Sequence, residues 1–338
     1  MSSEVASPMS PLGANVRKGK AATVFPSHVR RSFKHHPTDY TGELVRLLDD
    51  LSLVTHGISA HVAEADEQIR YGKVGNQKIT SDFVTREVYH SLANDGYACL
   101  ILSKGTQAPL TFPEYVPHGG YVVCLSPLSY DSLNDHFLSA AGTVFSVYKR
   151  KSSASLPGRS MDLQQNLGDQ VAAGYCVYSS ATTLYYTLGQ GLYSFVLHPL
   201  ARQYFLQPNH KLMWEPNVTC VYLDRNLLRE DTPLAHAVKK FVQDHNLRVG
   251  DSGCAVVNVA LCIQNGGLLV WKDAHLLCEA APISFLVEQG MGVAVSDQGQ
   301  RVLDLKSVEG NYHAPLTICC GPASAVEEIC ATMQSLQK

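Results

Sequence analysis

The sequence lacks the features of a membrane protein and of a small domain that a structural metal ion stabilises. No apolar run reaches the about 18 residues that a membrane-spanning helix needs, and the best candidate, residues 254–263, is short and contains Asn258. None of the ten cysteines forms a C-x-x-C pair, which argues against a zinc ribbon or a thioredoxin-type site. Charged residues make up only 17% and the net charge is −3, so nucleic acid is not expected as a general partner.

The first 40 residues differ in composition from the rest of the chain. They carry six Lys or Arg against Glu4 and Asp39, contain Ser and Pro, and show little apolar periodicity. This pattern predicts an extended basic arm over residues 1–40. The alternative is an organellar transit peptide, since such segments are rich in Ser and Arg and poor in acids.

Beyond residue 40 the periodicity predicts a mixed α/β chain. Leu44, Leu47, Leu48 and Leu51 begin an apolar stripe with helical spacing. Strand-like runs rich in β-branched and aromatic residues then follow, and after about residue 208 helices and strands alternate. We therefore expect an N-terminal domain over 41–208 and a C-terminal α/β domain over 209–338, with 338 residues long enough to bury a large core.

One segment resembles a known family in its order of strand and turn residues. Residues 119–149 read GGYVVCLSPLSYDSLNDHFLSAAGTVFSVYK. This resembles the fructose-1,6-bisphosphatase family, where the stretch runs approximately Y-V-V-x-F-D-P-L-D-G-S-S-N and then G-T-I-F-x-I-Y-R. Other blocks resemble the family in the same order, namely residues 42–48, 75–87, 171–182, 276–282 and 314–315. The resemblance covers nearly all of the chain after residue 40 and implies a layered αβαβα sugar-phosphatase fold, with two sheets covered by helices.

The resemblance also implies a magnesium site, and most of its carboxylates are replaced. Lys104 and Gly105 stand in place of two glutamates, and Ser126 and Ser129 in place of two aspartates, while Glu279 remains. Mg²⁺ requires hard oxygen ligands, so carboxylates are needed at fixed places. We therefore expect no metal, no cofactor and no catalytic residue here, hence an inactive pseudo-phosphatase, with Lys104 forming an ion pair with Glu279.

Two alternatives depend on residues that match the family better. Asp82 and Glu279 remain as acids, and together with Asp131 they could form a rebuilt metal site in a divergent metal-dependent sugar phosphatase. The second alternative is a regulatory subunit that senses an AMP-type nucleotide, because a helix N-terminus binds anions readily. Its candidate residues are Thr41, Gly42, Glu43, Tyr121 and Lys149. A capped helix packed on a strand, with no nucleotide bound, would also explain the presence of these residues.

The expected role is that of a structural or scaffolding subunit in a larger assembly. The basic arm 1–40 would bind an acidic protein partner by charge complementarity. The resemblance implies self-association, as a homo-oligomer or as a hetero-oligomer with an active paralogue. We expect a cytoplasmic location, which includes cytoskeletal assemblies, with organellar import as the alternative. We expect no nucleic acid partner and no membrane span.

Overall fold

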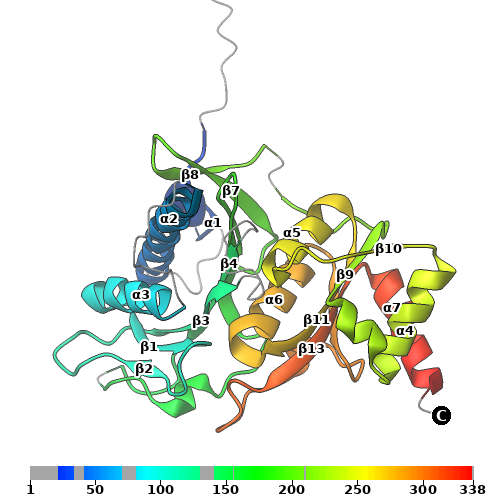
Figure 1. Ribbon diagram of the computed structural model, residues 1–338. Helices are drawn as coiled ribbons and strands as arrows, with labels where there is room; N and C mark the ends of the chain where they lie inside the picture. Colours follow the sequence, from blue (N-terminus) through cyan, green and yellow to red (C-terminus); the bar gives the residue numbers. More distant parts are fainter. Residues whose placement is uncertain are drawn as a thin grey trace, which may run out of the picture.

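The computed structural model describes residues 22–33, 42–70, 81–129, 141–154, 156–208 and 211–336. These residues form two β-sheets and three layers of helices (Figure 1). Among them, no helix has both the length and the apolar character needed to cross a membrane.

The larger sheet is built from the N-terminal half and has eight strands in the order β2-β1-β3-β4-β5-β6-β7-β8. Only β1 and β3 pair in parallel, and the other neighbours are antiparallel. In β3 and β4 all residues but the last of each strand are buried, because both faces of this sheet are covered, which explains their continuous apolar runs. The strands are β1 (Ala98–Ser103), β2 (Leu110–Thr111), β3 (Tyr121–Ser129), β4 (Ala141–Lys149), β5 (Gln170–Tyr178), β6 (Thr183–Thr187), β7 (Tyr193–His198) and β8 (Gln203–Leu206).

The smaller sheet is built from the C-terminal half and has five strands in the order β10-β9-β11-β13-β12. Its central strand β11 runs parallel to β9 and antiparallel to β13. The strands are β9 (Cys220–Leu223), β10 (Arg248–Gly250), β11 (Leu268–His275), β12 (Val293–Ser296) and β13 (Pro315–Gly321).

Helices cover both sheets and fill the space between them (Figure 1). Helices α1 (Phe25–Phe33), α2 (Gly42–Arg70) and α3 (Ser81–Asp95) lie on the outer face of the larger sheet, and α5 (Ala255–Asn265) and α6 (Ala281–Gln289) lie between the sheets. Helices α4 (Pro233–Asp244) and α7 (Ala323–Leu336) pack together outside the smaller sheet. The predicted αβαβα layering is therefore confirmed. Shorter helical turns are η1 (Ser160–Leu163), η2 (Arg225–Arg229), η3 (Leu276–Ala280, a π-helical turn) and η4 (Val302–Asp304).

The prediction of an extended arm over residues 1–40 is wrong for 25–33, which form α1. Phe25, Val29 and Phe33 are buried, and their four-residue spacing makes the apolar stripe of an amphipathic helix. Val24 adds a bridge to Phe205 in β8. Residues 1–21 and 34–41 lie outside the described residues, so the role of the arm in binding a partner stays a prediction.

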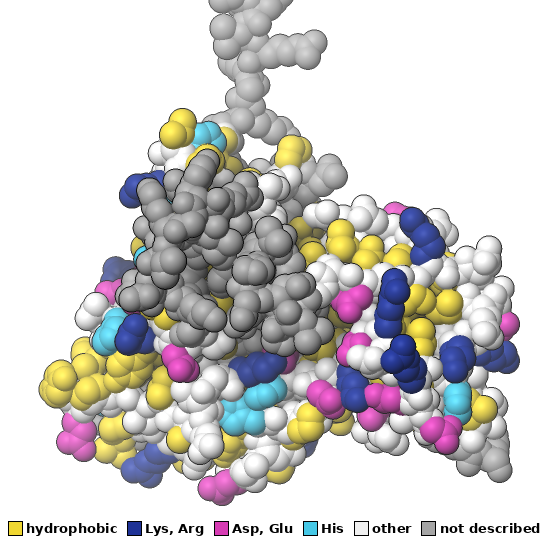
Figure 2. All heavy atoms as spheres, viewed as in Figure 1, with side chains coloured by type: hydrophobic (Ala, Val, Ile, Leu, Met, Phe, Trp, Pro, Cys, Tyr) yellow, Lys and Arg dark blue, Asp and Glu magenta, His cyan; other side chains and the backbone are white. Residues whose placement is uncertain are grey.

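One hydrophobic core runs through both halves of the chain. Val144 of β4, Val256 of α5 and Ile283 of α6 belong to the same buried cluster as Leu269 of β11 and Ile318 of β13. The domain boundary near residue 208 stays a prediction. On the outside, Figure 2 shows basic and acidic side chains interspersed over the half that carries β9, β11 and α4, as a net charge of −3 allows.

Candidate functional site

The candidate site lies where the end of β1 meets β3 and the turn η3. Because β1 and β3 are parallel, Ser103 lies opposite Leu125 in the ladder, and the backbone N–H of Lys104 donates to the Leu125 carbonyl at 2.9 Å. Lys104 therefore directly follows the carboxyl end of β1, beside Ser126 within the parallel strand β3. Such strand ends are common places for ligand sites in α/β folds.

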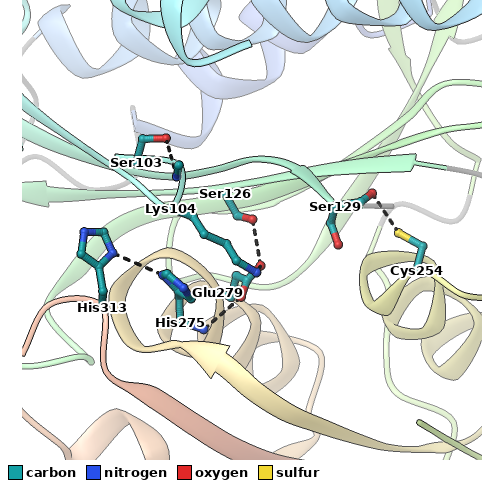
Figure 3. Close-up of polar contacts among 9 residues, drawn as sticks. Ser103, Lys104, Ser126, Ser129, Cys254, His275, Glu279 and His313 are labelled. Carbon is teal, nitrogen blue, oxygen red and sulfur yellow. Dashed lines mark hydrogen bonds and ion pairs between the residues drawn. The ribbon is translucent and has the colours of Figure 1, made fainter. Parts of the chain in front are cut away.

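Glu279 in η3 is fully buried, and both of its carboxylate oxygens accept hydrogen bonds. The Lys104 Nζ and the Ser126 Oγ each donate to Oε1 at 2.8 Å, and the His275 backbone N–H donates to Oε2 at 2.9 Å. Figure 3 shows Lys104 reaching from the end of β1 to this carboxylate, with Ser126 beside it. The predicted ion pair between Lys104 and Glu279 is confirmed.

The Lys104 side chain is partly exposed, with 41% of its surface accessible to solvent. The turn that follows it is held from α3, because the buried hydroxyls of Thr85 and Ser103 are 2.8 Å apart and hydrogen bonded. A Cβ atom added at Gly105 would lie 3.7 Å from Asp82 Oδ1. The structure thus brings Asp82 to the turn at 104–105.

Two histidines at the site were missed by sequence reasoning. His275 Nδ1 and His313 Nδ1 are 3.3 Å apart, and Figure 3 shows both rings on the side of Lys104. Each directly precedes a block that resembles the family, residues 276–282 and 314–315. That adjacency was the available signal.

Both imidazoles are held in the neutral form by their surroundings. Burial lowers the pKa of His275, the Lys104 cation and His313 lower it further, and Glu279 opposes the shift. Burial also lowers the pKa of His313, against a hydrogen bond with the Thr106 backbone that raises it. A neutral imidazole carries one N–H donor and one acceptor nitrogen. In the hydrogen bond between the two Nδ1 atoms one ring donates and the other accepts, so only the accepting ring keeps an N–H for another partner.

The described residues do not fit the divalent cation that the resemblance implies. An ammonium takes Oε1 of Glu279, and it would repel a second cation at that distance. Within residues 22–33, 42–70, 81–129, 141–154, 156–208 and 211–336, no group of three His, Cys, Asp or Glu is placed to hold a metal. Ser129 is the last residue of β3, and its backbone carbonyl accepts a hydrogen bond from the Cys254 thiol at 3.3 Å. Asp131, invoked for a rebuilt site, lies outside the described residues.

The candidate nucleotide residues are brought together in part. Tyr121 and Lys149 are paired across β3 and β4, and a Cβ added at the neighbouring Gly120 would lie 3.8 Å from Glu43 Oε2. Gly42 is the first residue of α2, and Thr41 lies outside the described residues. Nucleotide binding at this place stays a prediction.

Comparisons with known proteins extend over most of the chain. Residues 27–208 match the family model described as fructose-1-6-bisphosphatase, N-terminal domain. The fructose-1,6-bisphosphatase class 1 of Chloroherpeton thalassium is 28% identical over 313 residues, which cover 86% of this chain and 88% of that protein. The protein of the same name from Synechocystis sp. is 30% identical over 252 residues, 70% of each chain. The crystal structure of Leishmania major fructose-1,6-bisphosphatase in apo form, at 18% identity, matches with a TM-score of 0.80 over 93% of this chain and 100% of that one.

These relatives contradict the prediction that the chain is not an enzyme. Proteins named as fructose-1,6-bisphosphatases are similar to it over most of its length. The prediction failed physically because it equated the loss of four carboxylates with the loss of catalysis. Stabilisation of a transferring phosphoryl group needs positive charge and hydrogen-bond donors, and Lys or Arg side chains supply these as metal ions do. The replacements at Lys104, Gly105, Ser126 and Ser129 thus change the type of site without excluding an activity.

Proposed function

Because the chain belongs to the fructose-1,6-bisphosphatase family, we propose that it is a phosphatase that hydrolyses the phosphate ester of a phosphorylated sugar. The observation that carries this proposal is the partly exposed side chain of Lys104 at the end of β1, whose ammonium is paired with the buried carboxylate of Glu279. Fructose 1,6-bisphosphate, which the names of the relatives give as substrate, is the first sugar phosphate to test.

Lys104 is suited to bind the phosphoryl group. An ammonium has three N–H donors, and Glu279 Oε1 accepts one of them. The other two remain to donate to phosphoryl oxygens. A positive charge fixed before the reaction stabilises the charge that develops on these oxygens without rearrangement during the step.

The neighbouring side chains supply the remaining groups that ester hydrolysis needs. In the hydrogen bond between His275 and His313, the ring that accepts at Nδ1 carries its N–H on Nε2, and this N–H can be offered to an oxygen of the phosphoryl or leaving group. Asp82 is exposed and lies next to the turn at 104–105, so its carboxylate can orient the attacking water and accept its proton. Water attacks phosphorus, the ester oxygen leaves as the sugar hydroxyl, and inorganic phosphate is released.

The test is release of inorganic phosphate by the purified full chain from sugar mono- and bisphosphates. We expect Lys104→Gln and Asp82→Asn each to lower kcat/KM by about 100-fold or more, the scale for removing one group that stabilises the transition state. The matched control is Lys239→Gln, on the exposed face of α4 outside the smaller sheet, which should leave the rate unchanged. No release above the blank from any of these sugars, or a rate indifferent to Lys104→Gln, would refute the proposal.

A further inference from the structure

We infer that Lys104 is a covalently tethered counter-cation for Glu279, filling the place that a divalent ion would take between this carboxylate and a bound phosphoryl group. Glu279 is fully buried in η3, and one of its oxygens lies 2.8 Å from the ammonium. A buried carboxylate is costly unless hydrogen-bond donors or a cation compensate it, and of the three donors to Glu279 only the Lys104 ammonium carries a full positive charge. In this chain that charge is part of the polypeptide.

The backbone around Lys104 is fixed in a way that presents the ammonium to Glu279. Its N–H is bound to the Leu125 carbonyl at 2.9 Å, and the Ser103 carbonyl accepts from both the backbone N–H and the hydroxyl of Thr106 at 3.1 Å. These hydrogen bonds fix the turn after β1, and the Lys104 side chain points from it toward η3 (Figure 3). Ser126, from the neighbouring strand, completes the shell of Oε1 with a neutral donor.

The charges that meet at the Glu279 carboxylate balance without an added ion. Lys104 contributes +1 and Glu279 −1, the Ser126 hydroxyl is neutral, and burial keeps His275 and His313 uncharged near pH 7. A divalent ion would have to displace the ammonium from Oε1 and would find a single carboxylate in its place. Mg²⁺ and Mn²⁺ favour sites with several oxygen ligands, so the ammonium holds the better position.

This arrangement has a consequence for the reaction, which rests on the proposed function. An ammonium that is bonded on one side to a carboxylate and open on the other can bridge it to a phosphoryl oxygen. Phosphate release by the native chain should then proceed in EDTA, and added Mg²⁺ should change the rate less than twofold.

The experiment compares melting temperatures of the full chain in EDTA and in Mn²⁺, with Mn²⁺ binding followed by electron paramagnetic resonance. We expect the native protein to melt at the same temperature in both. Lys104→Gln should lower the Tm by about 3 to 6 °C in EDTA, the scale for loss of a partly exposed partner of a buried charge, and Mn²⁺ should restore part of this loss. Adding Glu279→Gln to Lys104→Gln should recover stability in EDTA and remove the response to Mn²⁺. Lys239→Gln is again the control.

Three outcomes would overturn the inference. The first is a native Tm that rises with Mn²⁺ together with Mn²⁺ binding that Glu279→Gln abolishes. The second is a Lys104→Gln variant that melts like Lys239→Gln. The third applies if Lys104→Gln fails to fold: folding of the double variant then supports the inference, and failure of the double variant as well refutes it. None of these readouts involves hydrolysis, so loss of the proposed activity with this Tm pattern intact would refute the proposed function alone.

Discussion

Asp162 is a buried carboxylate that accepts four hydrogen bonds. Its Oδ1 accepts from the backbone N–H groups of Lys151 and Ser152 at 2.8 and 2.6 Å, and its Oδ2 from the Ser152 hydroxyl and the Arg159 N–H at 2.7 and 2.8 Å. Burial alone would raise the pKa of Asp162, but these four donors outweigh it and hold the pKa below its ordinary value. This residue therefore organises the connection between β4 and β5.

We predict that Asp162→Asn lowers the free energy of unfolding by about 2 to 4 kcal/mol at pH 7, because an amide cannot accept all four bonds. The group has a lowered pKa in the folded state, so its contribution is complete above the unfolded value of about 3.9 and is lost as pH falls through the folded value. Urea denaturation should thus show the difference between native and variant shrinking below about pH 4. Asp304→Asn, at an exposed carboxylate beside Arg301, is the control. An equal difference at pH 7 and pH 3 would contradict this account.

The residues of the candidate site could be predicted only where a motif pointed to them. Lys104 and Glu279 fall on positions that the resemblance marks, and charge complementarity then predicted their pairing. His275 and His313 are 38 residues apart and meet because His275 pairs with Pro315 across β11 and β13. The register of that ladder is a property of the packed sheet, and nothing in either local segment indicates the other.

At the scale of elements, two glycines show opposite requirements for space. A Cβ added at Gly174 in β5 would lie 2.4 Å from the Phe145 ring and 2.9 Å from the Tyr185 carbonyl on the neighbouring strand. A Cβ added at Gly57 in α2 would meet nothing within 4 Å. Gly174 therefore leaves room for the Phe145 ring and for the close approach of β6. Gly57 fills no such role, and its low helix propensity makes α2 less stable than alanine would.

We predict that Gly174→Ala lowers the free energy of unfolding by about 1 to 3 kcal/mol, because the added methyl overpacks the sheet. Gly57→Ala should instead raise it by about 0.5 to 1 kcal/mol, through the better helix propensity of alanine. Equilibrium denaturation of the two variants gives both signs. A loss of stability in Gly57→Ala, or none in Gly174→Ala, would show that the environments differ from those described.

The elements that the sequence predicted best are those with a long apolar period. The stripe from Leu44 predicted α2, and the strand-like runs predicted the series of strands that follows it. Helix α1 was missed because its three buried residues, four apart, are interspersed with His, Arg and Ser, which suggested a solvated arm. Its burial depends on contacts with α2 and β8, and these are visible only in the assembled fold.

At the scale of the whole molecule, the two sheets share one core. Layer α5–α6 packs against β4 and β5 on one side and against β9, β11, β12 and β13 on the other. Lys104 adds a polar link, since it joins β1 of the larger sheet to η3, which follows β11 of the smaller one. Residues before about 208 form the larger sheet and residues after it form the smaller one. Both sheets nevertheless bury one face against the same pair of helices, α5 and α6.

We therefore predict that both halves unfold in one transition. Trp214 and Trp271 are the two tryptophans of the chain, and both lie in the C-terminal half. Trp214 is buried, with its indole N–H donated to the Gly267 carbonyl at 2.9 Å, so fluorescence reports on the smaller sheet while far-UV circular dichroism reports on all helices. Gly174→Ala acts in the larger sheet, and in a cooperative molecule it should shift the urea midpoints of both signals by the same amount. A fluorescence midpoint left at its native value, with a shifted dichroism midpoint, would mean that the two sheets unfold independently.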